Sequence, residues 1–273
     1  MVSCMLEMLR FVVVLCVVAY GGLALFALLF TNRMLFPQPP ASYAPSPEIV
    51  QIPSPDSGEG IATLYLPFPG SGRLLLYSHG NHEDLGTVRP RVELLHALGF
   101  NILVWDYPGY GLSGGRPTER TVKAAAEAVH AYARETLGHA PENTVLHGFS
   151  VGAGPTLHLA GQAEFAAVII ESAFTSAFDV VAPFRFLPWD VFDNAARIGD
   201  VTAPVLIIHG TDDSIVPFAH AKRLLARAPQ PRSFFWVEGA GHNNLPGTAG
   251  TAYTEAIRRF TDALRVPAER STD

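Results

Sequence analysis

From residue 48 onward, short runs of β-branched and Leu residues alternate with longer, Ala-rich amphipathic stretches. This alternation restricts the fold most, because it is typical of a mainly parallel sheet with helices on both faces. We predict strands at 48–52, 62–66, 73–78, 101–106, 144–148, 166–171, 204–209 and 233–238, and helices at 85–98, 119–137, 151–160, 218–228 and 248–264. Ligands of such sheets bind at the carboxyl ends of the strands, so we expect the chemistry in the loops that follow them.

Composition excludes two classes of function. The formal net charge is −6 and only 16% of residues are charged, without a long Lys/Arg run, so the chain lacks the basic surface that nucleic acid requires. Its two cysteines, Cys4 and Cys16, lie near the start of the chain. Cysteine catalysis and Cys-rich zinc sites are therefore excluded from the globular part.

Residues 11–30 form an uncharged apolar run of 20 residues, which matches the helix length needed to cross roughly 30 Å of hydrocarbon. We predict a single-pass membrane anchor over residues 1–34. A cleaved signal peptide is the alternative, since Arg10 precedes the run and Ala19-Tyr20-Gly21 resembles a cleavage site. The apolar run continues for nine residues past that site, which favours an uncleaved anchor.

A Pro-rich stretch follows this run and marks the expected domain boundary. Residues 35–47 read as an extended spacer, which argues against a buried core helix before it, and residues 48–273 as one catalytic domain. Arg10 and Arg33 flank the apolar run on opposite sides. The charge balance slightly favours an inside amino terminus, and hence a catalytic domain on the non-cytoplasmic side.

Gly148, Ser150 and Gly152 form a G-x-S-x-G motif directly after an apolar strand and before an Ala/Leu-rich helix. This context is that of a nucleophile elbow, in which small neighbours allow a sharp turn and the helix amino terminus favours negative charge. The same spacing recurs around Ser113, in a loop with no strand abutting it and no helix starting at once. We therefore predict Ser150 as the nucleophile and Ser113 as an ordinary loop serine.

In enzymes with this elbow the acid and then the histidine follow the serine along the chain. His242 lies in a Gly-rich loop after the last strand and is the predicted base. His209 ends a strand and should be buried and hydrogen-bonded, whereas His220 begins a helix and should lie on the surface. The acid is expected after the strand at 204–209, where Asp212 and Asp213 are adjacent and spacing alone does not choose between them.

The loop after the strand at 73–78 contains Ser78-His79-Gly80-Asn81-His82. We expect the backbone N–H groups of Asn81 and Val151 to form the oxyanion hole. His79 and His82 have no further His or carboxylate at ligand spacing, so we predict no metal site and no cofactor.

Several loops together resemble one family: S-H-G-N followed by E-D-L-G, D-Y-P-G-Y-G-L-S-G, G-F-S-V-G, H-G-T-D-D-S-I-V-P and G-A-G-H-N. They are similar to the membrane-anchored serine hydrolases grouped with the fungal bud-emergence protein and the mammalian α/β-hydrolase-domain-containing proteins. The resemblance covers roughly residues 35–264 and includes the leading Leu35-Phe36-Pro37. It implies the α/β-hydrolase fold, Asp213 as the acid and a short helical cap at about 173–201. Candidate substrate-pocket residues are His79, Phe149, Phe174, Phe178 and Trp189.

These features predict a serine hydrolase that cleaves carboxylic esters or thioesters through a Ser-His-Asp triad and an acyl-enzyme. The anchor and the aromatic cap favour an acyl-lipid-like substrate. Within the same chemistry, a serine aminopeptidase-type peptidase is an alternative. Acidic residues placed to bind a free amine would favour it, and the sequence does not locate any. A non-catalytic hydrolase-fold protein that binds a ligand or partner is the alternative from another class, and intact triad residues argue against it.

Overall fold

The predicted strands form a single eight-stranded sheet. The computed structural model describes residues 2–181 and 187–264, so residues 182–186 of the expected cap and the end of the expected domain lie outside the described residues. The strands are β1 (Ile49–Pro53), β2 (Gly60–Leu66), β3 (Leu74–Ser78), β4 (Asn101–Trp105), β5 (Thr144–Phe149), β6 (Ala167–Glu171), β7 (Val205–Gly210) and β8 (Arg232–Val237). All eight predicted strands are confirmed, with ends displaced by at most two residues.

The sheet has the order β1-β2-β4-β3-β5-β6-β7-β8. β2 pairs antiparallel with β1 and β4, and the pairs from β4 across to β8 are parallel. The carboxyl ends of β3, β5, β7 and β8 therefore lie along one edge of the sheet. This edge is where the predicted site residues meet.

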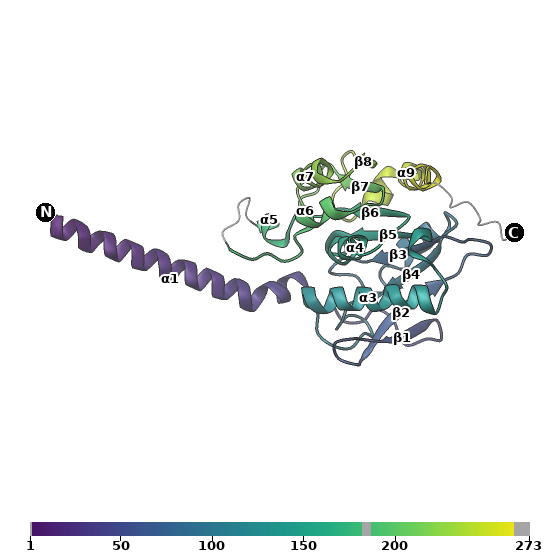
Figure 1. The fold of residues 1–273 in the computed structure, drawn as a ribbon, viewed down its shortest axis with the longest axis horizontal. Helices are drawn as coiled ribbons and strands as arrows, with labels where there is room; N and C mark the ends of the chain where they lie inside the picture. Colours follow the sequence, from purple (N-terminus) through teal and green to yellow (C-terminus); the bar gives the residue numbers. More distant parts are fainter. Residues whose placement is uncertain (1, 182–186, 265–273) are drawn as a thin grey trace.

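Helices cover both faces of the sheet (Figure 1). They are α1 (Val2–Leu35), α2 (Arg89–His96), α3 (Glu119–Glu135), α4 (Ala153–Ala160), α5 (Ala177–Val181), α6 (Asn194–Arg197), α7 (Ala219–Arg227), α8 (Leu245–Ala249) and α9 (Thr251–Asp262), with 3₁₀ turns η1 (Pro141–Asn143), η2 (Ser150–Gly152) and η3 (Ile198–Asp200). Because strand side chains alternate, Leu146 packs on the α3, α4 and α7 side and Val145 on the α2 and α9 side. Both faces of the sheet are thus buried.

Two predicted helices differ from the structure for local reasons. The helix expected at 85–98 begins at Arg89, because Pro90 fits only the first turn of a helix. The helix expected at 248–264 is divided into α8 and α9 at Gly250, whose φ of +57° does not belong to a right-handed helix.

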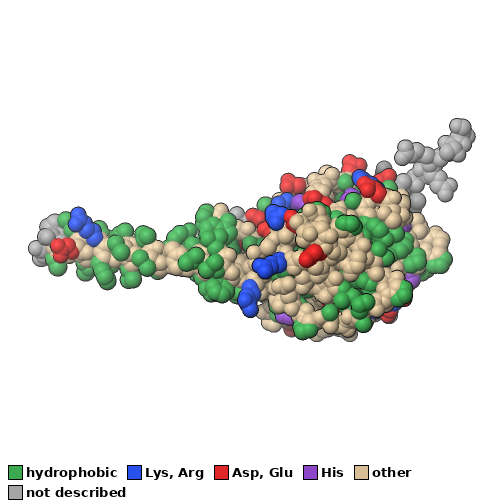
Figure 2. All heavy atoms as spheres, turned by 90° about the horizontal axis from the view of Figure 1, so that it is seen from below, with side chains coloured by type: hydrophobic (Ala, Val, Ile, Leu, Met, Phe, Trp, Pro, Cys, Tyr) green, Lys and Arg blue, Asp and Glu red, His purple; other side chains and the backbone are tan. Residues whose placement is uncertain are grey.

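Helix α1 projects from the domain as a long rod (Figure 1). Apolar side chains cover most of its length, and charged ones lie near its far end (Figure 2). Residues Cys4–Leu35 make it long and apolar enough to cross a membrane.

The segment after α1 is mostly exposed but contacts the domain at several points. Phe36 is buried and packs edge-on against the rings of Tyr107, Tyr110 and Phe192. Further along, the backbone N–H of Ser42 donates to Asp84 over 2.6 Å, and the Tyr43 hydroxyl donates to Asp106. The stretch expected as an extended spacer therefore contacts the domain, and the domain boundary at residue 48 stays a prediction.

Candidate active site

Ser150 lies where β5 turns into η2 and α4, and its φ of +54° is in the left-handed region. A Cβ on Gly148 would lie 2.5 Å from the Gly152 carbonyl oxygen, and a Cβ on Gly152 would lie 2.1 Å from the Ser78 carbonyl oxygen. Both positions therefore lack room for any side chain. This crowding holds Ser150 in a conformation that costs an isolated serine roughly 1–3 kcal/mol.

His242 and Asp213 complete a line of hydrogen-bonding groups with Ser150. Oγ of Ser150 is 2.9 Å from Nε2 of His242, and Nδ1 of His242 is 2.7 Å from Oδ2 of Asp213. All three side chains are buried, although each comes from a different loop, after β5, β7 and β8. The carboxylate favours a proton on Nδ1, so Nε2 can accept the hydroxyl proton of Ser150.

Asp213 is held by the turn that contains it. Its Oδ1 accepts the backbone N–H groups of Ile215 and Val216 at 2.9 and 2.8 Å. Burial alone would raise the pKa of Asp213, but the hydrogen bond and charge of His242 and the backbone donors lower it below its ordinary value. The carboxylate is thus ionised and oriented at neutral pH.

The residues that compete with the predicted triad have other partners. Asp212 is exposed and its backbone N–H donates to Ala240, as expected of a turn residue. His209 is buried with Nε2 2.9 Å from the Val216 carbonyl oxygen and 3.3 Å from Oδ2 of Asp213, and burial lowers its pKa. The surface position expected for His220 is wrong, since it is buried against Thr175 of the cap segment.

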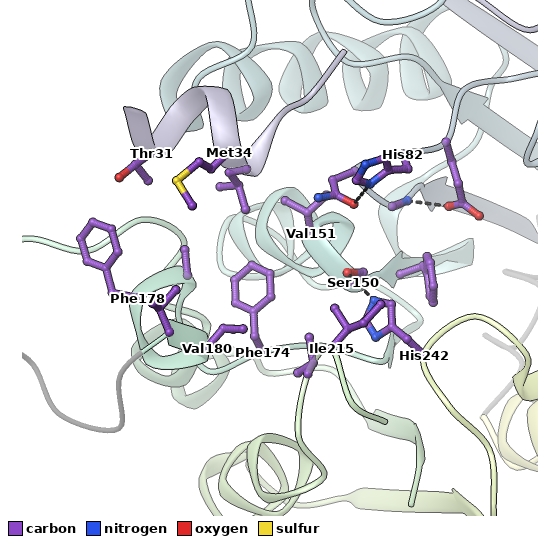
Figure 3. A pocket seen from close by; sticks show the side chains of 18 of the residues that line it. Thr31, Met34, His82, Ser150, Val151, Phe174, Phe178, Val180, Ile215 and His242 are labelled. Atoms are coloured by element: carbon purple, nitrogen blue, oxygen red, sulfur yellow. Dashed lines mark hydrogen bonds between the residues drawn. The ribbon is translucent and has the colours of Figure 1, made fainter. Parts of the chain in front are cut away.

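The loop after β3, which carries His82, lines the same cavity as Ser150 (Figure 3). Hydrogen bonds from the loop after β4 fix it in place. The Tyr110 hydroxyl donates to the Asn81 carbonyl over 2.9 Å, and the Tyr107 hydroxyl donates to the His79 carbonyl. The Gly80 N–H donates to Glu83 over 2.7 Å. Asn81 and Val151 both line the same cavity as Ser150, and the oxyanion hole expected from their N–H groups stays a prediction.

A cavity of about 460 Å³ opens over Ser150 and His242. Of the predicted pocket residues, Phe149, Phe174 and Phe178 line it. Two predictions are wrong: His79 and Trp189 do not line it. His79 is fully buried beneath its loop, its ring stacked on Tyr107 at 4.1 Å, and burial lowers its pKa to about 4. Trp189 is half-buried and lies outside the cavity.

Helix α1 supplies part of the cavity wall, which sequence reasoning missed. The contributing residues are Leu23, Phe26, Ala27, Thr31, Met34 and Leu35. They recur every three or four residues, so they share one face of the helix. The sequence shows apolar residues on every face of this part of the helix. No polar face therefore marks which side contacts the domain.

A buried polar cluster lies next to the site, and it was not predicted from the sequence. Glu171 at the end of β6 accepts from Arg91 at 2.5 Å and from the Tyr253 hydroxyl at 2.7 Å, and it lies 3.1 Å from Nε2 of His147. Burial alone would raise the pKa of Glu171, but Arg91 and His147 lower it to about 2. The Arg91 guanidinium also lies 4.1 Å from the centre of the Phe149 ring, next to Ser150.

Metal ligands are not gathered in the described part of the chain. Over residues 2–181 and 187–264, no three His, Cys, Asp or Glu side chains are grouped so that they could hold an ion. His82 instead contacts the Asn81 side chain at 2.8 Å (Figure 3). The expectation of a reaction without metal or cofactor stays a prediction.

Solved structures share this fold. An esterase of Pyrococcus furiosus, Pf2001, is similar with a TM-score of 0.70 at 18% identity, covering 83% of this chain and 98% of the esterase. An α-β serine hydrolase homologue from Coxiella burnetii is similar with a TM-score of 0.61 at 20% identity, covering 82% of this chain and all of that one. At these identities the likeness concerns the fold alone.

Sequence relatives are more similar. No protein-family model matches the chain. Alpha/beta hydrolase domain-containing protein 17B of Homo sapiens is 40% identical over 207 residues, which cover 74% of this chain and 71% of the human protein. Protein 17C of Xenopus laevis is 40% identical over 195 residues, but the match spans only 62% of the frog protein. The family predicted from the motifs is thus confirmed, and the chain belongs to the α/β-hydrolase domain-containing proteins.

Proposed function

We propose that this member of a hydrolase family is a serine hydrolase that cleaves long-chain carboxylic esters or thioesters at a membrane. The observation that carries the proposal is the continuous contact from Ser150 through His242 to Asp213, at 2.9 and 2.7 Å. Hydrogen-bond distances within about 2.6–3.2 Å are those at which a base activates a nucleophile.

The reaction follows from these contacts. His242 accepts the Ser150 proton while Oγ attacks the acyl carbonyl carbon, and the N–H groups of Val151 and Asn81 stabilise the oxyanion. The protonated His242 then gives its proton to the departing alcohol or thiol, leaving an acyl-enzyme. Water, deprotonated by the same His242, releases the carboxylic acid and restores Ser150. No cofactor takes part in this scheme.

The cavity walls support an acyl substrate over a peptide with a free amino terminus. Apolar side chains of α1 and the cap segment make up most of the lining. Glu83 is the carboxylate among the described lining residues, and it already accepts the Gly80 N–H. An aminopeptidase would need an unengaged acid to bind the ammonium group.

Anchoring by α1 is part of the proposal. A helix with this length and hydropathy partitions into a bilayer, and it would hold the site beside substrates that reside there. The side of the membrane on which the domain lies stays a prediction.

Labelling with a fluorophosphonate probe tests the proposal. We expect the detergent-solubilised protein to be labelled, and the label to disappear in Ser150→Ala but persist in the matched Ser113→Ala variant. Folded wild-type protein that takes up no label, or label that survives Ser150→Ala, would contradict the proposed nucleophile.

A further inference from the structure

Helix α1 does more than end beside the active site, because one of its faces forms a wall of the cavity over Ser150. Thr31 and Met34 lie across the cavity from Phe178 and Val180, while Ser150 and His242 lie at its other end (Figure 3). The space between α1 and the cap segment is therefore continuous with the triad. Its volume of about 460 Å³ is within the range of ligand pockets.

The wall overlaps the part of α1 that is apolar enough to lie in hydrocarbon. Leu23, Phe26 and Ala27 belong to the uncharged run that ends at Phe30, and Arg33 follows one turn later. From Leu23 to Met34 the helix rises about 16 Å. The cavity thus reaches from the catalytic groups to Leu23, Phe26 and Ala27 in the part of α1 that is apolar enough to lie in hydrocarbon.

The opposite wall is apolar as well and is open to the surroundings. Val181 on the cap segment and Ile215 beside Asp213 line the cavity, with 76% and 55% of their surfaces exposed. Large apolar side chains exposed around a pocket mark a surface that another apolar group covers. Here the covering group must reach Ser150, where the reacting carbonyl binds.

From these contacts we infer that α1 and α5 together form the acyl-chain site, and that the substrate enters sideways from the bilayer. The occupant is the linear acyl tail of a membrane-resident ester or thioester, lying along the α1 face defined by Leu23, Ala27 and Met34. Its carbonyl reaches Ser150 while the far end of the tail stays among the lipids. This inference rests on the proposed hydrolase function and adds to it a route and a chain-length determinant.

An Ala-to-Trp pair on α1 tests the inference in phosphatidylcholine nanodiscs. Ala27→Trp fills the cavity, whereas Ala19→Trp adds the same side chain to an exposed part of α1 outside it. For Ala27→Trp we expect kcat/KM on 4-nitrophenyl tetradecanoate to fall about tenfold or more, with 4-nitrophenyl butanoate changed by less than about twofold. Ala19→Trp should leave the ratio of the two substrates unchanged.

Phe26→Ala provides a second variant that enlarges the cavity, with Phe11→Ala as its control on exposed helix. It should shift the preference toward longer chains. Equal effects on short and long substrates in both cavity variants would overturn the inference. The Ala27→Trp effect must also appear with a monoacylglycerol and with an S-acylated peptide carrying the same chain, because α1 contacts the chain; a loss confined to one of them would overturn it.

Fluorophosphonate labelling separates the two levels of failure. Each variant is expected to retain labelling, because Ser150 and His242 are untouched. A labelled enzyme that hydrolyses both chain lengths with an unaltered ratio in Ala27→Trp and Phe26→Ala would overturn the acyl site alone. A wild-type protein without label or hydrolysis would overturn the proposed function, and the inference with it.

Discussion

Two loops of this chain carry glycine, serine and glycine at the same spacing, but the hydroxyl groups of the two serines have different hydrogen-bond partners. Oγ of Ser150 lies 2.9 Å from a buried histidine nitrogen. Oγ of Ser113 donates to the Asp106 carbonyl over 2.9 Å and accepts the Ala62 N–H over 2.8 Å, so both of its roles are occupied by backbone. One serine is available to react, and the other fastens a loop to β2.

The glycines of the two loops are needed for different reasons. Gly152 has an ordinary backbone but no space for a Cβ, and Ser150 beside it has the positive φ. In the other loop Gly115 has a φ of +86°, while a Cβ on it would meet nothing closer than 3.5 Å. At the second glycine of the motif, the same spacing therefore reflects crowding in one loop and backbone handedness in the other, whereas Gly111 has both a φ of +50° and no room for a Cβ, which would lie 1.9 Å from Asp106 Oδ2. The preceding strand, more than the motif, distinguishes them.

The largest expected effect is on kcat, which should depend on Ser150, whereas Ser113 should affect only the free energy of unfolding. Ser150→Ala should lower kcat on a long-chain ester at least about 1,000-fold, because nothing else at the site provides the attacking oxygen. Ser113→Ala should keep kcat but lower the free energy of unfolding by about 1–3 kcal/mol, since it leaves the buried Ala62 N–H without its acceptor. Hydrolysis assays and denaturant unfolding of both variants measure this. A large loss of kcat in a folded Ser113→Ala protein would break the comparison.

The glycines should differ in whether asparagine rescues them. Gly152→Ala is expected to unfold the protein or cost at least about 3 kcal/mol, because the Ser78 carbonyl is backbone and cannot move aside. Gly115→Ala should cost about 1–2 kcal/mol, and Gly115→Asn less, because asparagine tolerates positive φ. Thermal unfolding gives the ranking. Rescue of position 152 by asparagine would contradict the crowding argument.

Asp106, on the Ser113 side, should make stability fall as pH rises toward neutrality. Burial raises the pKa of Asp106 to about 7, although hydrogen bonds from Tyr43 and Leu85 oppose this. Between about pH 4 and 7 the folded state therefore binds a proton that the unfolded state has lost, so stability falls as pH rises through this window. We expect Asp106→Asn to flatten this slope, shifting the unfolding temperature by a few degrees at pH 8 relative to wild type. An equal slope in both proteins would refute the assignment.

The smallest effect concerns the contact between the two loops. Tyr110→Phe removes the hydroxyl that holds the Asn81 carbonyl, so kcat should fall about fivefold while KM stays similar, a loss of about 1 kcal/mol. Tyr65→Phe, which loses hydroxyl contacts with His139 and Asn101 away from the site, is the matched control. Equal kcat losses in the two variants would point to general loosening rather than to the oxyanion loop.

Much of this architecture was predictable because it depends on local chemistry. The eight strands follow from short apolar runs, and Ser150 and His242 follow from loops placed after them. The side chains of Ser150, His242 and Asp213 lie in hydrogen-bond contact, and their catalytic roles stay a prediction. The choice of Asp213 over Asp212 as the acid required the family resemblance. The two are neighbouring aspartates, and they differ only in the direction in which the turn points their side chains.

Other features depended on packing between distant segments. The assignments of His79 and His220 failed because their burial is set by Tyr107 and Thr175, which are remote in sequence. The cluster of Arg91, Glu171 and Tyr253 joins three elements that are far apart in the sequence, so no sequence motif predicts it. The α1 wall of the cavity is the clearest example of such packing, since the face of α1 that lines the cavity is the one that lies opposite the cap segment.

The joint at Phe36 has a consequence for how the enzyme reaches its substrate. A domain joined to its membrane anchor by a long flexible linker samples many orientations and can contact a neighbouring membrane. Here Phe36 enters the core directly after α1 ends, so the domain turns in phase with the helix. One residue inserted into α1 would rotate the domain by about 100° and raise it about 1.5 Å. With α1 in a bilayer, as proposed, Ser150 would be held at one height and in one orientation, facing molecules of a single leaflet.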